Sequence, residues 1–250
     1  MAAQHTRNPR HRLALLLVDV NRSFFDTDGP FHYPGALENL GPLHQLLDAA
    51  RSGGRLVVHA REAHRRGFHD YERPKLPDHS YLGDRDQEPY PGFEELPGEV
   101  VIHKRRFSAF FATDLALLLQ EQGVERVIIA GVKTNVCIRA SVQDAFAYGF
   151  RPTIARGTVS SNRPHLHEAS LEDIQRYIGD VVDLDVAVGW LRNQGPRSGV
   201  EKRGENQGPR SGVEKRGENQ GPRSGVEKRG ENQGPRSGVE KRGDNHGPRD

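Results

Sequence analysis

The chain has 250 residues, with 36 Lys and Arg against 34 Asp and Glu, and a single cysteine. One cysteine excludes an internal disulfide, so Cys137 is either a small buried side chain or a working thiol. The small positive excess belongs to the C-terminal repeats, because the rest of the chain carries slightly more acidic than basic residues. The body therefore gives no electrostatic sign of a nucleic-acid partner, and none is expected.

Residues 1–11 are basic and are predicted to form a flexible N-terminus. The apolar run that follows, Leu13 to Val18, ends at Asp19 and is too short for a secretory signal or a membrane span. A cytoplasmic location and no membrane partner are therefore expected.

Residues 12–192 are predicted to form one α/β domain, long enough for a sizeable core. Short apolar, β-rich runs alternate with helical patterns, which is typical of a parallel sheet covered on both faces. Six strands are predicted, in the segments LALLLVDV, RLVVHA, EVVIHK, RVIIAGV, RPTIA and DVVDL. Amphipathic spacing predicts helices at residues 36–50, 113–122, 135–148, 166–178 and 185–191.

Two segments lack this alternation. Residues 61–98 are rich in Pro, His, Arg and Asp, and a loop that long inside a domain is usually functional, so it is predicted to form the wall or lid of a site at the strand ends. Residues 193–250 repeat the unit NQGPRSGVEKRGE, which holds one apolar side chain. One valine per unit cannot offset the entropy of ordering the backbone, so these 13-residue repeats are predicted to be a disordered tail.

Three polar residues stand where separate strands are predicted to end: Asp19, Lys104 and Cys137. Neighbouring strand ends lie about 5 Å apart in a parallel sheet, so these side chains converge if their strands are neighbours. Such a trio has a chemical logic, with a thiolate as nucleophile, an ammonium and a helix N-terminus that lower the pKa of the thiol, and a carboxylate that moves the proton. Asn135 is a good N-cap, which places Cys137 in a first helical turn whose amides can receive an oxyanion.

Each residue alone also fits a structural role: filler for Cys137, a cap or turn for Asp19 and a solvated charged face for Lys104. The set gains weight from three ordered segments, LLLVDVNRSFF, KRRFSAFFATDL and VERVIIAGVKTNVCIRASVQDAFAYGF. These segments resemble the isochorismatase-like cysteine hydrolases, which include nicotinamidases, N-carbamoylsarcosine amidases, ureidoacrylate amidases and biuret-type hydrolases. The resemblance covers essentially residues 13–191, and the repeats have no counterpart in it.

The resemblance implies a Rossmann-like three-layer sandwich with a six-stranded parallel sheet. It implies Asp19 as general base, Cys137 as nucleophile and Lys104 as electrostatic partner. It also implies a cis peptide between Val132 and Lys133, with the amides of Lys133 and Cys137 as the oxyanion hole. The expected reaction is hydrolysis of a small C–N amide through a thioester, in a homo-oligomer, either dimer or tetramer, and without a cofactor.

The segment REAHRRGFHDYERPK favours a ureido or carbamoyl substrate, such as biuret, triuret, ureidoacrylate or an N-carbamoyl amino acid. Arg61 or Arg139 is expected to pair a substrate carboxylate. The further substrate-binding candidates, for each of which a structural role competes, are Asn21, Phe24, Phe110, Thr134, Asn135 and Asn162, with Phe107 and Phe111 as other possible wall residues.

Three alternatives stay open. The nicotinamidase branch binds zinc, and Glu62, His64 and His69 are weak candidates for such a site, although surface or substrate contacts fit them better and no metal is expected. True isochorismatases cleave a vinyl ether without a cysteine nucleophile. The presence of Cys137 argues against this activity here. A non-catalytic binding protein has no need of the full trio.

Overall fold

The computed structural model describes residues 13–192, and the predictions for the N-terminus and for the repeats lie outside the described residues. The sheet is parallel, with strand order β3-β2-β1-β4-β5-β7 and β6 beside β4. Its strands are β1 (Leu13–Val18), β2 (Leu56–Glu62), β3 (Val100–Lys104), β4 (Arg126–Val132), β5 (Arg151–Ala155), β6 (Val159–Ser160) and β7 (Asp180–Val182). The six predicted strands are confirmed, and β6 is an addition too short to leave a sequence pattern.

Strand β1 lies at the centre of the sheet, between β2 and β4. All six of its residues are buried, as a continuous apolar run in a parallel sheet requires. Because side chains alternate along a strand, Leu16 and Val18 join one core cluster while Leu15 and Leu17 join the other. The sheet therefore has two apolar faces, and each needs a layer of helices.

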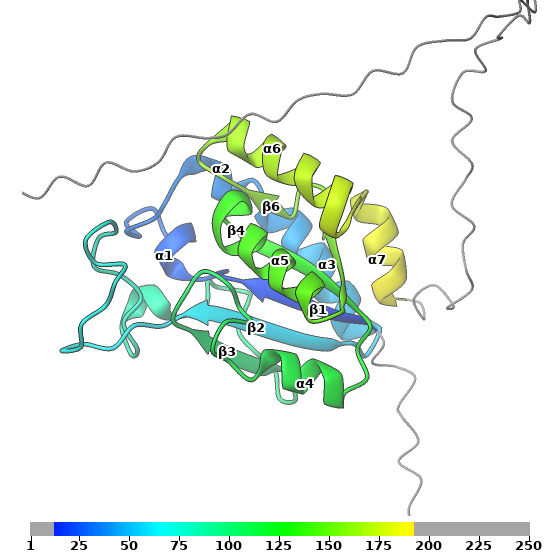
Figure 1. Ribbon diagram of the computed structural model, residues 1–250, viewed down its shortest axis with the longest axis horizontal. Coiled ribbons are helices and arrows are strands. Elements are labelled where there is room, and N and C mark those ends of the chain that lie inside the picture. The colour runs from blue at the N-terminus through cyan, green and yellow to red at the C-terminus, as the bar shows by residue number, and fades with distance from the viewer. Residues whose placement is uncertain (1–12, 193–250) are drawn as a thin grey trace, which may run out of the picture. The chain divides into compact units, whose positions relative to one another are not determined.

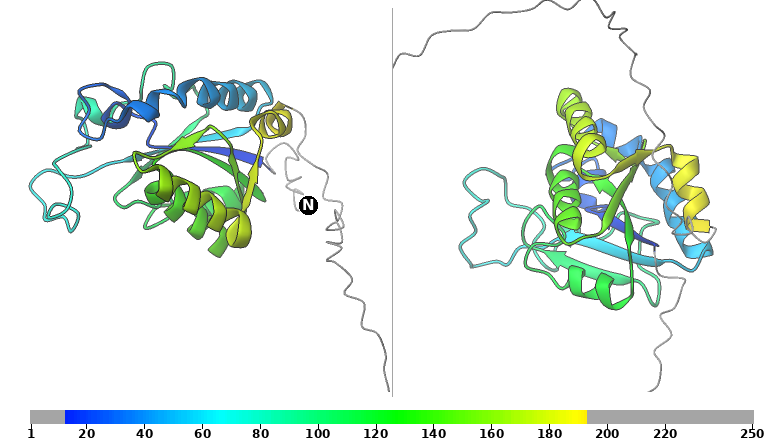
Figure 2. Two further views of the ribbon diagram at one scale, coloured as in Figure 1. Left: turned by 90° about the horizontal axis from the view of Figure 1, so that it is seen from above. Right: turned by 45° about the vertical axis from the view of Figure 1, so that its right-hand side comes forward.

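Helices cover both faces, as Figure 2 shows. The helices α3 (Leu40–Ser52) and α7 (Leu184–Arg192) pack on one face, and α4 (Leu115–Glu121), α5 (Arg139–Ala147) and α6 (Pro164–Asp173) pack on the other. The predicted three-layer α/β sandwich is confirmed. No helix within residues 13–192 has the length and apolar composition needed to cross a membrane.

Several predicted helix boundaries were wrong. The helix expected at residues 36–50 is divided into α2 (Pro34–Leu37) and α3, and a short helix α1 (Arg22–Phe25) follows β1. The helices expected at residues 135–148 and 166–178 each contain a π-helical turn, η3 (Thr134–Ile138) before α5 and η4 (Ile174–Ile178) after α6. Apolar spacing does not separate a π-turn from the α-helix that it joins, and π-turns are frequent at functional sites.

The long segment after β2 begins later than expected, because Arg61 and Glu62 are the last residues of the strand and pair with His103 and Lys104 of β3. From there the chain extends away from the sheet at the carboxyl end of β2 (Figure 1). Its one regular element is the 3-10 turn η2 (Arg85–Gln87). The loop thus leaves the sheet at the edge where ligands bind in open α/β folds.

Candidate active site

The side chains of Asp19, Lys104 and Cys137 meet at the carboxyl edge of the sheet. The Nζ atom of Lys104 lies 2.8 Å from Oδ2 of Asp19 and 3.6 Å from Sγ of Cys137. Asp19 and Lys104 are completely buried, and Cys137 is 3% exposed. One ammonium therefore contacts both the carboxylate and the thiol.

Backbone contacts hold Asp19 in place immediately after β1. Its N–H donates to the carbonyl oxygen of Ala60 at 2.8 Å, and its Oδ1 accepts the N–H of Glu62 at 2.8 Å. Its φ of 56° is in the left-handed region, which Asp tolerates better than most residues at a cost of about 1 to 3 kcal/mol. Neighbouring β4 needs Gly131, since a Cβ there would lie 2.0 Å from the carbonyl oxygen of Val18.

Cys137 lies in the π-turn η3, which begins at Thr134, so Asn135 is inside the turn and the predicted N-cap was wrong. Lys133 occupies the cap position without a side-chain cap bond, and Asn135 Oδ1 instead accepts the hydroxyl of Ser161 at 2.6 Å. The peptide between Val132 and Lys133 is cis, as the resemblance implies. Cys137 still falls in the first helical turn after β4.

Burial raises the pKa of the Cys137 thiol well above its usual 9.0, although Lys104 acts in the opposite direction. The prediction of a lowered pKa was wrong because complete burial outweighs the nearby ammonium and the helical turn. Burial also raises the pKa of Asp19, against the lowering effect of Lys104 and of a hydrogen bond with Cys137. Burial therefore raises the pKa of both acidic members of the trio, and Lys104 opposes this rise in each.

The substrate-binding candidates fall into two groups. Asn21 and Phe24 follow Asp19 and are buried, and both polar side-chain atoms of Asn21 lack a hydrogen-bond partner among the described residues. Thr134 is buried beside Cys137, and its hydroxyl lies 2.8 Å from Nδ1 of His167. These residues lie next to the trio in the chain, as does Asn135.

The other candidates lie elsewhere or have other partners. Arg61 pairs with Glu95 at 2.5 Å, and Arg139 contacts Gln143 and Asp173. Phe110 is 1% exposed and packs in the core against Phe150, which precedes β5. Three further candidates are exposed to solvent: Phe107, Phe111 and Asn162.

A second polar cluster lies beyond the trio, and the sequence indicated half of it. Ligand atoms of Glu62, His64, Glu72 and His79 all lie within 4.8 Å of one another. Of the two roles expected for Glu62 and His64, a surface position was wrong, because both are 2% exposed, whereas contact with a substrate stays a prediction. His69 is outside the cluster, exposed against the ring of Tyr71, because the loop turns it away from the other histidines.

The histidines of this cluster are oriented by their outer nitrogens. Nδ1 of His64 lies 2.9 Å from Oδ2 of Asp70, and Nδ1 of His79 lies 2.6 Å from the carbonyl oxygen of Pro77. Their Nε2 atoms, Oε1 of Glu62 and both carboxylate oxygens of Glu72 are buried without a hydrogen-bond partner among the described residues. Although burial acts in the opposite direction, Lys104 and the two histidines hold the pKa of Glu62 well below 4.5. Two imidazoles and two carboxylates that converge in this way are a chemically suitable zinc-ligand set.

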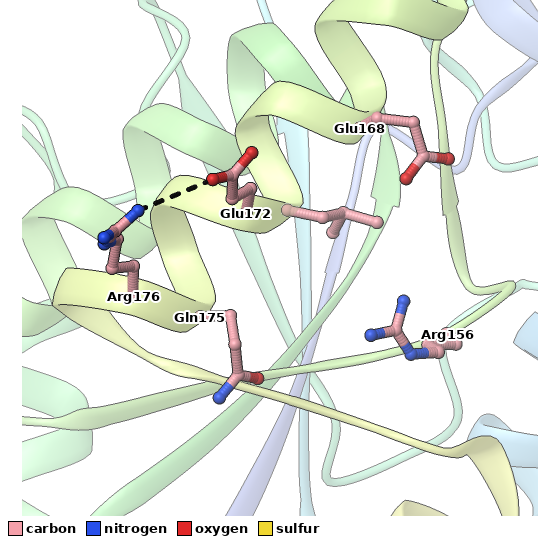
Figure 3. Close-up of a pocket in the computed structure, with 6 residues that line it drawn as sticks. Arg156, Glu168, Glu172, Gln175 and Arg176 are labelled. Atoms are coloured by element: carbon pink, nitrogen blue, oxygen red, sulfur yellow. Dashed lines mark ion pairs between the residues drawn. The ribbon is translucent and has the colours of Figure 1, made fainter. Parts of the chain in front are cut away.

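Surface hollows on the described part of the chain include one beside the helices and one near the loop after β2. One of about 520 Å³ lies beside α6, and its charged lining includes Arg156, Glu172 and Arg176, with an ion pair between the last two (Figure 3). It contains no residue of the trio or of the cluster. The other, of about 360 Å³, is lined by His79, Pro30, Tyr81, Arg66 and the four aspartates Asp28, Asp78, Asp84 and Asp86. Of the four cluster residues, this lining contains His79 alone.

The model of the isochorismatase domain matches residues 13–186, which is almost all of the described chain. The chain belongs to the isochorismatase family. It is 36% identical to maleamate amidohydrolase of Pseudomonas putida over 72% of this chain and 87% of that protein, and 32% identical to N-carbamoylsarcosine amidase of an Arthrobacter species over 72% of each. A solved structure, the pyrazinamidase of Pyrococcus horikoshii in complex with zinc, matches with a TM-score of 0.63 and 28% identity over 69% of this chain and 99% of that one. The predicted family and enzyme class, an amidohydrolase, are confirmed.

Proposed function

We propose that the protein hydrolyses a small C–N amide bond of the ureido or carbamoyl type through a cysteine thioester. The observation that carries this proposal is the position of the Lys104 ammonium, 2.8 Å from the Asp19 carboxylate and 3.6 Å from the Cys137 sulfur. Negative charge can pass from Asp19 to sulfur without leaving the reach of the ammonium. The transfer exchanges one buried anion for another beside the same cation, which keeps its electrostatic cost low.

The proposed reaction begins when Asp19 takes the proton of the Cys137 thiol and Sγ attacks the amide carbonyl carbon. The backbone N–H groups of Lys133 and Cys137 receive the oxyanion of the tetrahedral intermediate. Protonated Asp19 then gives its proton to the departing ammonia or amine, and the C–N bond breaks. Water, deprotonated by Asp19, hydrolyses the thioester and restores the thiol.

Ammonia release from a substrate panel tests this proposal. The panel contains maleamate, N-carbamoylsarcosine, ureidoacrylate, biuret, triuret and nicotinamide, and Cys137→Ala is the control for each. The proposal expects release from at least one compound by the wild type and none above background by Cys137→Ala. Trapping the acyl group on Cys137 by mass spectrometry after rapid acid quench tests the thioester. No product from any compound by a folded wild type would favour the non-catalytic binding alternative.

A second candidate function is supported by the buried Glu62, His64, Glu72 and His79 cluster: a metal-assisted amidase of the nicotinamidase type. Nε2 of each histidine faces the carboxylates without a hydrogen bond, as metal-ligand atoms do. These residues would hold the ion, which would supply Lewis-acid binding of a substrate nitrogen or oxygen. The panel, run with and without a chelator, separates the two candidates, because the first expects no loss of activity and the second expects turnover of nicotinamide that zinc restores.

Dimer or tetramer formation and a cytoplasmic location also remain proposals for this chain. Light scattering at micromolar concentration tests the first, and a monomer would refute it.

A further inference from the structure

The side chain of Lys133 is held in a cage of three aromatic rings. Its Nζ atom lies 5.8 Å from the ring centre of Phe24, 5.4 Å from that of Phe31 and 5.3 Å from that of Tyr33. Phe24 and Tyr33 are almost fully buried, and the hydroxyl of Tyr33 is fixed 2.8 Å from Oγ of Ser160. Rings within about 6 Å attract an ammonium through their negative faces, so the cage fixes the position of this positive charge.

Lys133 has no ion-pair partner among the described residues, unlike Lys104 and Arg61. Lys104 pairs with Asp19, and Arg61 pairs with Glu95. Burial lowers the pKa of the half-buried Lys133, and the positive charge of Arg163 lowers it further, although the thiolate form of Cys137 would act in the opposite direction. A partly desolvated ammonium without a counterion favours the arrival of an anion.

The position of this charge relates it to the reaction. The backbone amide of Lys133 belongs to the proposed oxyanion hole, and Cys137 lies in the turn that starts immediately afterwards. The ammonium is therefore one four-carbon stem away from the amide that would bind the reacting carbonyl oxygen. Phe24, which packs against the ammonium, also follows Asp19 in the chain. The charge of Lys133 also interacts with Cys137, so an anion bound by Lys133 would lie near the scissile amide of the same molecule.

We propose that the ammonium of Lys133 binds a carboxylate of the substrate, so that the enzyme prefers small amides with an acid group close to the amide over neutral ureas and amides. This inference rests on the proposed amide hydrolysis and moves the expected carboxylate partner from Arg61 and Arg139 to Lys133. It makes Lys133 a specificity-determining residue through its side chain, separate from the role of its backbone amide.

Paired substrates test the inference. Maleamate and maleic diamide differ in one carboxylate, as do N-carbamoylsarcosine and its neutral amide. The variant Lys133→Met removes the charge but keeps a long side chain and the backbone N–H. We expect the ratio of kcat/KM for the acid to kcat/KM for the neutral partner to fall about 10- to 100-fold, mainly through KM, as for the loss of a charged hydrogen bond. Lys133→Arg should restore part of the ratio, and the exposed Lys75→Met should leave it at the wild-type value.

An equal fall for both members of a pair would overturn the inference, since the residue would then act through the backbone or the fold alone. A wild type that prefers the neutral partner would also overturn it. A separate measurement keeps the inference distinct from the proposed function: calorimetric binding of maleate to Cys137→Ala and to Cys137→Ala with Lys133→Met. Maleate binding that requires Lys133, together with a folded wild type that hydrolyses no compound of the panel, would sustain the carboxylate site and reject the hydrolase. No binding to either variant, with acids and neutral amides hydrolysed equally well, would reject the carboxylate site and leave the hydrolase.

Discussion

The trio and the neighbouring histidine cluster are two buried polar groups that meet at Glu62. They differ in how their charged and polar atoms are paired. In the trio, the ammonium of Lys104 contacts both Asp19 and Cys137. In the cluster, the facing atoms of His64 and Glu72 lie 3.8 Å apart, and those of His79 and Glu62 lie 3.4 Å apart, without hydrogen bonds. In the trio each charged group has a partner of opposite charge, and we call it the closed group. In the cluster the nitrogen and oxygen atoms point their lone pairs at a common centre without hydrogen bonds, and we call it the open cluster.

Glu62 belongs to both groups. Its backbone N–H donates to Asp19, while its carboxylate turns toward His64 and His79. The same residue pairs with Lys104 in the register of β2 and β3. Buried charges are tolerated when they are paired or coordinate a metal. The trio shows the first arrangement, and the ligand types of the cluster would suit the second.

The largest effect is expected for Asp19→Asn, which removes the base from the closed group. Because burial raises the pKa of the Cys137 thiol, the thiol stays protonated near neutral pH without a base. We expect kcat/KM to fall about 10²- to 10⁴-fold, measured by ammonia release. The exposed Asp28→Asn is the matched control and should keep wild-type activity. Activity within tenfold of the wild type in Asp19→Asn would show that another group takes the proton.

Lys104→Met tests the closed group through stability. The change leaves the Asp19 carboxylate buried beside Glu62 without its cation. Removing one partner of a buried pair costs about 3 to 5 kcal/mol, which urea unfolding measures as a lower midpoint at unchanged slope. Lys75→Met, at an exposed position, should stay within about 0.5 kcal/mol of the wild type. Equal midpoints for Lys104→Met and the wild type would mean that Asp19 is neutral when Lys104 is present.

The trio could be predicted from the sequence because each member stands at or shortly after the end of a recognisable apolar strand. The continuous run before Asp19 and the run before Lys104 fix where the strands end, and parallel strands bring those ends to one edge. The same reasoning predicted that strands and helices alternate along the chain. It could not predict the pKa of Cys137, which depends on how completely the neighbouring layers bury the sulfur.

The cluster was half predicted for a different reason. Glu62 and His64 stand at a strand end, where local spacing is informative, whereas Glu72 and His79 come from a loop without periodicity. His69 was named as the later histidine of a metal motif, but its ring contacts that of Tyr71. The path of a long loop is set by tertiary contacts, such as the bonds of Asp70 with His64, Arg105 and Arg106. The cage around Lys133 was missed because its rings lie about a hundred residues earlier in the chain and give no local signal.

Zinc addition tests whether the cluster of Glu62, His64, Glu72 and His79 binds a cation. At a concentration about 100 times Kd, a ligand of the folded state adds about 2.7 kcal/mol, which raises the Tm of a domain of this size by about 5 to 10 °C. His79→Asn and Glu72→Gln should lose most of this rise, while His69→Asn, whose side chain lies outside the cluster, should keep it. Calorimetry with a chelator as reference measures the effect. An equal rise in the wild type and His79→Asn would place the ion elsewhere.

The smallest effect is expected at a third ionic group, formed by Glu99 with Arg51 and His59. Its charges are paired, like those of the trio, so it is a reference for the trio and for the histidine cluster. Although burial acts in the opposite direction, hydrogen bonds from Arg51, from the backbone N–H of Leu96 and from His59 hold the pKa of Glu99 at about 2. A depressed carboxyl pKa stabilises the fold above the unfolded value of 4.5, and this stability is lost as pH falls from 4.5 toward 2. Glu99→Gln should therefore cost about 1 to 2 kcal/mol at pH 7, and the difference from the wild type should shrink between pH 4.5 and pH 3. The exposed Glu38→Gln is the control and should show no such trend in urea unfolding. If the difference between Glu99→Gln and the wild type stays constant over this pH range, then the packing of Glu99, rather than its charge, stabilises the fold.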